Sequence, residues 1–142
     1  MKPLHESLIW LDLPARMDSL AALRAFALER AAAQGMSEGV CARIDLVLEE
    51  VLLNIFYYAY KGEPGRVSLG CGKVEQRGFL VRVTDQGQPF DPLQRDAPDT
   101  TGQIEDRPIG GLGVLLARQM SSAMAYHRQD NSNVLDIFFQ EV

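Results

Sequence analysis

The sequence predicts an α+β fold in which helices cover one face of a largely antiparallel sheet. Short segments rich in β-branched and aromatic residues come in neighbouring pairs joined by turns, as strands do in hairpins. Two long segments with helical patterns, the first of them rich in Ala and Leu, follow one another with no strand between them. Grouped helices beside paired strands are typical of this class. The 142 residues suit a single domain spanning 1–142, and 46% hydrophobic with 23% charged residues is ordinary globular composition.

The first half of the chain is expected to hold one strand and then two helices. The strand covers residues 7–13 and ends at Pro14. The first helix covers residues 18–34, with Asp18 as its N-cap and Gly35 as its stop signal. The second helix is capped by Ser37 and runs to about residue 60, before a Gly- and Pro-containing turn at 62–64.

The second half is expected to hold two hairpins separated by a long loop and one helix. The first hairpin pairs strands 66–74 and 78–84 around a turn at 76–78. Residues 85–113 contain four prolines and five glycines, and so long a loop in a small domain is often functional. A helix at 112–122 follows. Strands 124–128 and 134–141 then close the chain around a polar turn at 130–133.

Charge and composition exclude several classes of partner. With 14 Lys and Arg against 19 Asp and Glu, the net charge of -5 predicts no direct nucleic-acid binding and no attraction to anionic membranes. No apolar run approaches the roughly 20 residues that span a bilayer, and Glu6 and Asp12 interrupt any signal-peptide core. We therefore expect a cytoplasmic protein. Cys41 and Cys71 have no neighbours at metal-ligand spacing and are expected to be small buried hydrophobes.

The second helix carries a polar pair at the edge of its apolar face. At about 100° per residue, one arc of the helix collects the apolar side chains, which are Val40, Ile44, Val47, Leu48, Val51 and Ile55. Glu50 and Asn54, four residues apart, lie together at one edge of this arc, whereas Glu49 points to the opposite, solvent side. The pair either forms part of a functional site or merely borders the core.

A second candidate feature is VTDQGQPFDP at residues 83–92, where a strand ends at Asp85. A carboxylate there can accept a hydrogen bond from the amino group of a base. Gly87, two residues on, has no side chain and would let a flat ring approach. The alternative is an Asx-type turn that simply leaves the strand.

A third feature is IGGLG at residues 109–113, at the start of the expected helix. Free backbone N–H groups at a glycine-rich helix start can bind phosphates. The segment is neither a Walker A loop nor a dinucleotide fingerprint, because no Gly-Lys-Ser/Thr and no second βα unit follow it. A flexible hinge is the alternative.

Together and in this order, the three features resemble the N, G1 and G2 boxes of the GHKL ATPase superfamily, the gyrase and histidine-kinase type ATP-binding domains. Within this superfamily, the chain looks like the small bacterial anti-sigma factor serine kinases. The matching stretches are LEEVLLNIFYYAY at 48–60, VTDQGQPFDP at 83–92 and IGGLGVLLARQMSSAMAYHR at 109–128. The resemblance covers essentially the whole chain.

The resemblance implies a two-layer α/β sandwich of the Bergerat type, with Mg²⁺ and ATP between helices and sheet under a lid at about 93–110. It makes Glu50 the general base and Asn54 the magnesium ligand. It makes Asp85 the acceptor for the adenine amino group and packs Gly87 against the adenine. The remaining positions assigned to the nucleotide are Phe90, Arg107, Gly110, Gly111, Leu112 and Gly113. Of these, Arg107 would meet the γ-phosphate, and Gly111 and Gly113 would be lid hinges whose amides meet the phosphates.

The chain also departs from the family pattern at three places. Tyr57 and Tyr58 stand where the family often has a charged residue followed by His. In the final strand, the place of a Thr near the adenine falls on Asp136. A carboxylate there would repel Asp85 and raise one of the two pKa values.

The resemblance predicts an ATP-dependent protein-serine kinase that phosphorylates a small anti-sigma antagonist protein. The unphosphorylated antagonist would bind the kinase and so release a sigma factor or another regulator, and relatives suggest a homodimer. The alternative is an ATP-binding interaction module without phosphate transfer. A detached histidine-kinase catalytic domain is a weaker fit, because the DQGQPFDP form is less typical of that group.

Overall fold

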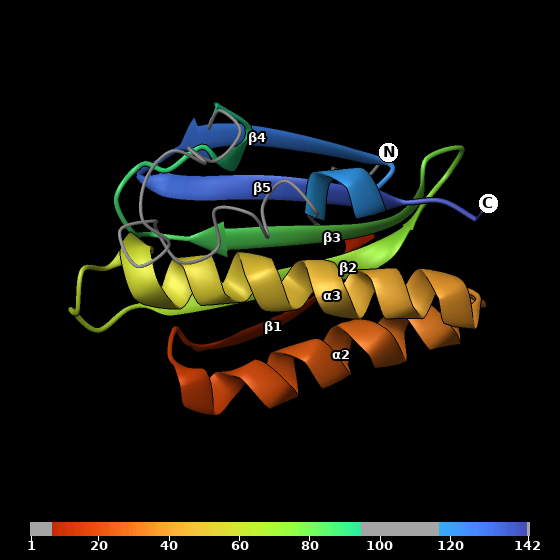
Figure 1. Cartoon of the computed structure of the whole chain (residues 1–142), viewed down its shortest axis with the longest axis horizontal. Helices are drawn as coiled ribbons and strands as arrows, with labels where there is room; N and C mark the ends of the chain where they lie inside the picture. Colours follow the sequence, from red (N-terminus) through yellow and green to blue (C-terminus); the bar gives the residue numbers. More distant parts are fainter. Residues whose placement is uncertain (1–6, 95–116, 142) are drawn as a thin grey trace, which may run out of the picture.

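The computed structural model describes residues 7–94 and 117–141, in which five strands form one antiparallel sheet of order β1-β2-β3-β5-β4. The strands are β1 (Ile9–Pro14), β2 (Arg66–Val74), β3 (Gly78–Asp85), β4 (Ala123–Gln129) and β5 (Ser132–Phe139). Helices α2 (Leu20–Ala33) and α3 (Glu38–Asn54) lie side by side over one face of the sheet (Figure 1). This arrangement confirms the predicted α+β class.

Of the two expected N-caps, the structure confirms one and replaces the other. Ser37 caps α3 as predicted, since its Oγ accepts a hydrogen bond from the backbone N–H of Val40 at 3.2 Å. The prediction that Asp18 caps the first helix is wrong, because a 3-10 turn, η1 (Met17–Ser19), places Ser19 at that position. The α-helical part of α3 ends at Asn54 and continues as a π-helical segment, η2 (Ile55–Ala59), which ends within a residue of the expected position.

A short 3-10 turn, η3 (Pro92–Gln94), lies beyond β3. Residues 117–120 are helical and lie at the end of the helix expected at 112–122.

The last hairpin is tighter than the sequence suggested. Asp130 and Asn131 both have positive φ, 52° and 63°, as the two central residues of a type I′ turn do. The turn therefore needs only these two residues, and β5 begins at Ser132 instead of Val134. As a result, Asn133 is a strand residue and pairs directly with Asp85 of β3.

Alternation along the strands divides the sheet into a helix-facing side and an opposite side. The helix-facing side and the two helices share the main core, whose sheet residues include Val67, Leu69, Cys71, Phe79, Val81, Val83, Leu135, Ile137 and Phe139. A small second cluster of Leu8, Leu80 and Phe138 lies on the opposite side. Cys71 is buried, as expected of a small hydrophobe, and burial raises the pKa of its thiol to about 12, whereas Cys41 is half-buried.

Among the helices that the structure describes, none combines the length and apolarity required to cross a bilayer.

Candidate functional site

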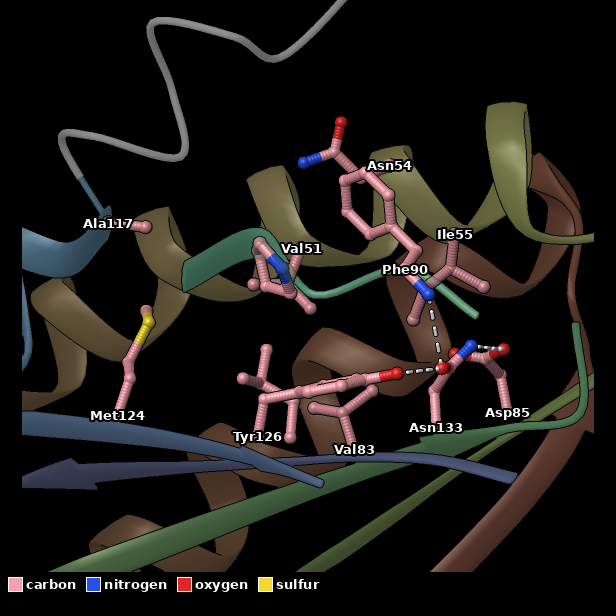
Figure 2. A pocket seen from close by; sticks show the side chains of 12 residues that line it. Val51, Asn54, Ile55, Val83, Asp85, Phe90, Ala117, Met124, Tyr126 and Asn133 are labelled. Atoms are coloured by element: carbon pink, nitrogen blue, oxygen red, sulfur yellow. Dashed lines mark hydrogen bonds between the residues drawn. The ribbon is translucent and has the colours of Figure 1, made fainter. Parts of the chain in front are cut away.

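A pocket lies between the C-terminal part of α3 and the helix-facing side of β3, β5 and β4 (Figure 2). Its walls are mainly apolar and include Val51, Ile55, Val83, Pro92, Met124 and Leu135. Its polar lining residues are Asn54, Asp85, Asn133 and, through its hydroxyl, Tyr126. An apolar slot with a few fixed polar groups suits a flat, partly polar ring.

Asp85, the last residue of β3, is a buried carboxylate held in one orientation. Its Oδ1 accepts hydrogen bonds from the backbone N–H of Gly87 at 2.9 Å and from Nδ2 of Asn133 at 3.0 Å. Burial raises the pKa of this carboxyl, while these two hydrogen bonds and the charge of Arg128 act in the opposite direction. Within residues 7–94 and 117–141, no hydrogen bond reaches its second oxygen, Oδ2. Asp85, the acceptor predicted at the strand end, therefore lines the pocket, and its Oδ1 is already hydrogen-bonded within the protein.

Asn133 connects Asp85 to the loop that follows β3, and it was not among the site residues predicted from the sequence. Besides the bond to Asp85, its Nδ2 donates to the backbone carbonyl of Gln88 at 2.8 Å. Its Oδ1 accepts from the hydroxyl of Tyr126 at 2.5 Å and from the backbone N–H of Phe90 at 3.3 Å (Figure 2). Phe90, a predicted nucleotide contact, thus lies in the pocket and is tied to it through its backbone.

Gly87 is not among the residues that line the pocket, and its missing side chain has a packing reason. A Cβ at this position would lie 2.3 Å from the carbonyl oxygen of Ala59 and 2.5 Å from its Cβ. The missing side chain therefore lets the loop after β3 pack directly on η2. The backbone N–H of Gln88 donates to the same carbonyl at 2.8 Å.

Glu50 and Asn54 carry unpaired acceptor atoms. Oε1 of Glu50 and Oδ1 of Asn54 are both buried and have no hydrogen-bond partner among the described residues. Burial, and secondly the charge of Glu49, raise the pKa of Glu50. Two buried oxygens without partners, one helical turn apart, are unusual because each costs free energy, so a ligand that satisfies them is expected. An amide oxygen is a ligand type that suits Mg²⁺, which takes oxygen ligands and keeps several of its waters.

Exposure alone does not separate Glu50 from Glu49. The prediction that Glu49 is a solvated surface charge is only partly right, since it is half-buried and its charge acts on Arg24 of α2. What distinguishes Glu50 is its unpaired buried oxygen and the direction of its pKa. In the parts of the chain that are described, no three His, Cys, Asp or Glu side chains gather as a metal cluster.

The expected conflict between Asp136 and Asp85 does not occur. Asp136 lies on the face of the sheet away from the helices, where its carboxylate accepts two hydrogen bonds from Arg82 at 2.6 and 2.8 Å. The residue of β5 beside Asp85 is Asn133, so assigning the family's Thr position to Asp136 was wrong. The other two departures also leave the pocket intact, because Tyr57 is exposed and neither it nor Tyr58 lines the pocket.

The remaining predicted site residues, Arg107 and the segment 110–113, lie outside the described residues, as does almost all of the expected lid. Their roles stay predictions.

Comparison with known proteins agrees with this geometry. The profile of the histidine kinase-like ATPase domain matches residues 13–139. The chain belongs to this family. Membership implies ATP binding. The chain is also 25% identical over 131 residues to the serine-protein kinase RsbW of Bacillus thuringiensis strain Al Hakam and to that of Bacillus cereus strain 03BB102. Each alignment covers 89% of this chain and 81% of the relative.

Proposed function

We propose that this ATPase domain is a cytoplasmic protein-serine kinase that transfers the γ-phosphate of ATP to a small anti-sigma antagonist protein. The observation that carries the proposal is the pair of unpaired buried oxygens on Glu50 and Asn54, at the end of α3 that borders the pocket. A module that only bound nucleotide would need an oxygen for the metal, but it would not need a second, basic oxygen beside it.

In this proposal, the base of ATP occupies the apolar pocket and its amino group donates to Asp85. Oδ2 is the oxygen that the described residues leave open, on a residue that is only 5% exposed overall. A donor on the ligand would supply the hydrogen bond that the described residues do not give this oxygen. The apolar walls account for the rest of the binding through burial of the ring faces.

Glu50 is the proton acceptor in the transfer step. Its raised pKa makes it a stronger base than an ordinary glutamate, and Oε1 is free to accept. The serine oxygen bonds to the γ-phosphorus, the bond from that phosphorus to the bridging oxygen breaks, and the serine proton passes to Glu50. Asn54 holds Mg²⁺, which supplies charge neutralisation at the phosphates when it is bound.

Partners follow from the same proposal. The two relatives are named serine-protein kinases, which supports a protein serine as the phosphate acceptor. We assign the antagonist as substrate, a sigma factor or another regulator as the protein released, and a homodimer as the working assembly. Asp136 gives no support to the alternative of an interaction module without transfer, because its carboxylate is paired with Arg82 on the other face.

Phosphate transfer by three proteins tests the role of Glu50. The antagonist is first captured from native cytoplasm with Mg-ATP and with ADP, and its phosphorylated serine is mapped. Glu50→Gln keeps the size of the side chain and removes its basicity, so we expect near-normal ATP binding with transfer slowed about 10²–10⁴-fold. Glu49→Gln is the matched control and should change transfer little. Transfer by Glu50→Gln at the parental rate would exclude Glu50 as the base. No transfer by the parent, with ATP still tightening antagonist binding, would favour the interaction module.

Calorimetry with ATP tests the base pocket separately. Asp85→Asn exchanges an acceptor for a group that also presents donors, so ATP binding should weaken by roughly tenfold or more. Equal affinities of parent and variant would remove Asp85 from the base pocket.

A further inference from the structure

The orientation of the Asn133 amide is fixed by its surroundings. The two groups near its nitrogen, the Asp85 carboxylate and the Gln88 carbonyl, can only accept hydrogen bonds. The backbone N–H of Phe90, near its oxygen, can only donate. Rotating the amide by 180° would therefore replace these bonds with repulsive contacts, so Nδ2 is held towards Asp85.

Because this amide is fixed, the two carboxylate oxygens of Asp85 differ in their hydrogen bonding. Oδ1 accepts from both Asn133 and the backbone N–H of Gly87, and these two bonds use its two lone-pair directions. Oδ2 takes no hydrogen bond from the part of the chain that the structure describes. A ligand in the pocket therefore meets a carboxylate with one available acceptor oxygen, although a free carboxylate would offer two.

One available oxygen matters because purine bases differ in how many adjacent donors they present. A 6-aminopurine presents one donor, its exocyclic amino group, beside an acceptor ring nitrogen. A 2-amino-6-oxopurine presents two adjacent donors, its ring N–H and its 2-amino group. That pair matches a carboxylate with two open oxygens, in the same way that a guanidinium does.

We propose that Asn133 is the specificity-determining residue of the base pocket, because it occupies Oδ1 of Asp85 and so favours a base with one donor, adenine, over guanine. The inference rests on the proposed binding of the base at Asp85. It adds a role for a residue that touches Asp85 directly and has a fixed donor there. Arg128, the partner of Asn133 on β4, supports the same loop by donating to the carbonyl of Gly87 at 2.8 Å.

The test compares the affinities of parent and Asn133→Ala for ATP, GTP and ITP by calorimetry with Mg²⁺ present. In the variant, Oδ1 regains an open acceptor position. We expect the ratio of the GTP to the ATP dissociation constant to fall about tenfold, the effect of one hydrogen bond to a charged group. ITP has the 6-oxo group but no 2-amino group, so it should gain much less than GTP. A purely structural role for Asn133 would weaken all three nucleotides alike.

Gln88→Ala is the matched control. Its side-chain amide ties the same loop to the carbonyl of Tyr58 at 2.8 Å and does not contact Asp85. Loosening the loop in this way should leave the GTP to ATP ratio unchanged. Circular dichroism melting confirms that each variant is folded, and if Asn133→Ala is not, Asn133→Ser replaces it in the same comparison.

The outcomes separate the two proposals. An unchanged ratio in the Asn133 variant, or an equal fall in Gln88→Ala, overturns the selection role and leaves ATP binding at Asp85 standing. A parent that binds none of the three nucleotides, or binds them without dependence on Asp85, overturns the proposed base pocket instead.

Discussion

Replacing Gly87 by Ala is expected to destabilise the fold itself, in addition to any effect on the nucleotide. The new Cβ would lie 2.3 Å from the carbonyl oxygen of Ala59, 2.5 Å from its Cβ and 2.6 Å from its carbonyl carbon. Two of these atoms belong to the backbone, so rotating a side chain cannot relieve the contact. Overpacking of this kind costs about 1–3 kcal/mol. Displacing the loop also weakens the hydrogen bond from Gln88 to the same carbonyl, which adds about 1 kcal/mol.

Thermal and urea unfolding of the nucleotide-free protein measure this effect. A loss of about 2–4 kcal/mol corresponds to a fall in melting temperature of roughly 4–16 °C for a chain near this size. Gly39→Ala is the matched control, since its Cβ would meet only Oγ of Ser37 at 3.8 Å. That substitution lies within a helix and should be neutral or stabilising by up to about 1 kcal/mol.

A double variant distinguishes the contact with the Cβ of Ala59 from the contact with its carbonyl oxygen. Ala59→Gly removes only the Cβ of Ala59, so adding it to Gly87→Ala should recover little stability while the carbonyl oxygen remains in the way. Unchanged unfolding of Gly87→Ala, with a loss of ATP affinity alone, would refute the packing argument. It would instead favour the interpretation from sequence, in which this glycine only makes room for the base.

Two further predictions concern charged residues. Burial raises the pKa of Glu50, so the carboxyl stabilises the fold only while protonated, and this contribution is lost as pH rises through its folded pKa. Glu50→Gln should therefore have a larger free energy of unfolding than the parent at neutral pH, by at most about 1 kcal/mol in a part-exposed site, and the difference should disappear in acid. A difference that does not vary with pH would contradict this. Asp136→Ala leaves the part-buried Arg82 without its ion-pair partner and should cost about 2–4 kcal/mol of stability while ATP affinity stays at the parental value. A matching loss of affinity would place Asp136 at the base after all.

The sequence predicted the elements that depend on local pattern. The apolar arc of α3 is long and regular, so its core-facing residues and the edge position of Glu50 and Asn54 could be identified before any contact was known. The Ser37 cap and the bounds of β2 were likewise predicted from nearby residues. Each of these features is determined within a few residues of the chain.

The wrong or missing predictions concern residues whose neighbours depend on the pairing of strands and on the packing of distant segments. Setting the start of β5 two residues late hid Asn133 within a turn, although the Asp130-Asn131 pair suits a two-residue I′ hairpin and could have revealed the correct start. Asp136 was placed beside Asp85, but it is an odd number of residues from Asn133 and so faces the other side of the sheet. The contact between Gly87 and Ala59 joins segments that only the fold brings together, so no local pattern could predict it.

The contacts between the loop after β3 and η2 connect the two halves of the site. Besides the bond from Gln88 to Ala59, the hydroxyl of Tyr60 accepts from the backbone N–H of Gln86 at 2.8 Å. η2 follows Asn54 without a break, so the loop beginning at Asp85 is attached to the helix that carries the unpaired oxygens. Departures to π-helical geometry are frequent at functional sites, and here η2 supplies the carbonyls that the loop binds. In the proposed kinase, these contacts would set a base bound at Asp85 at a fixed distance from Glu50, and such fixed positioning is a large part of what phosphoryl transfer requires.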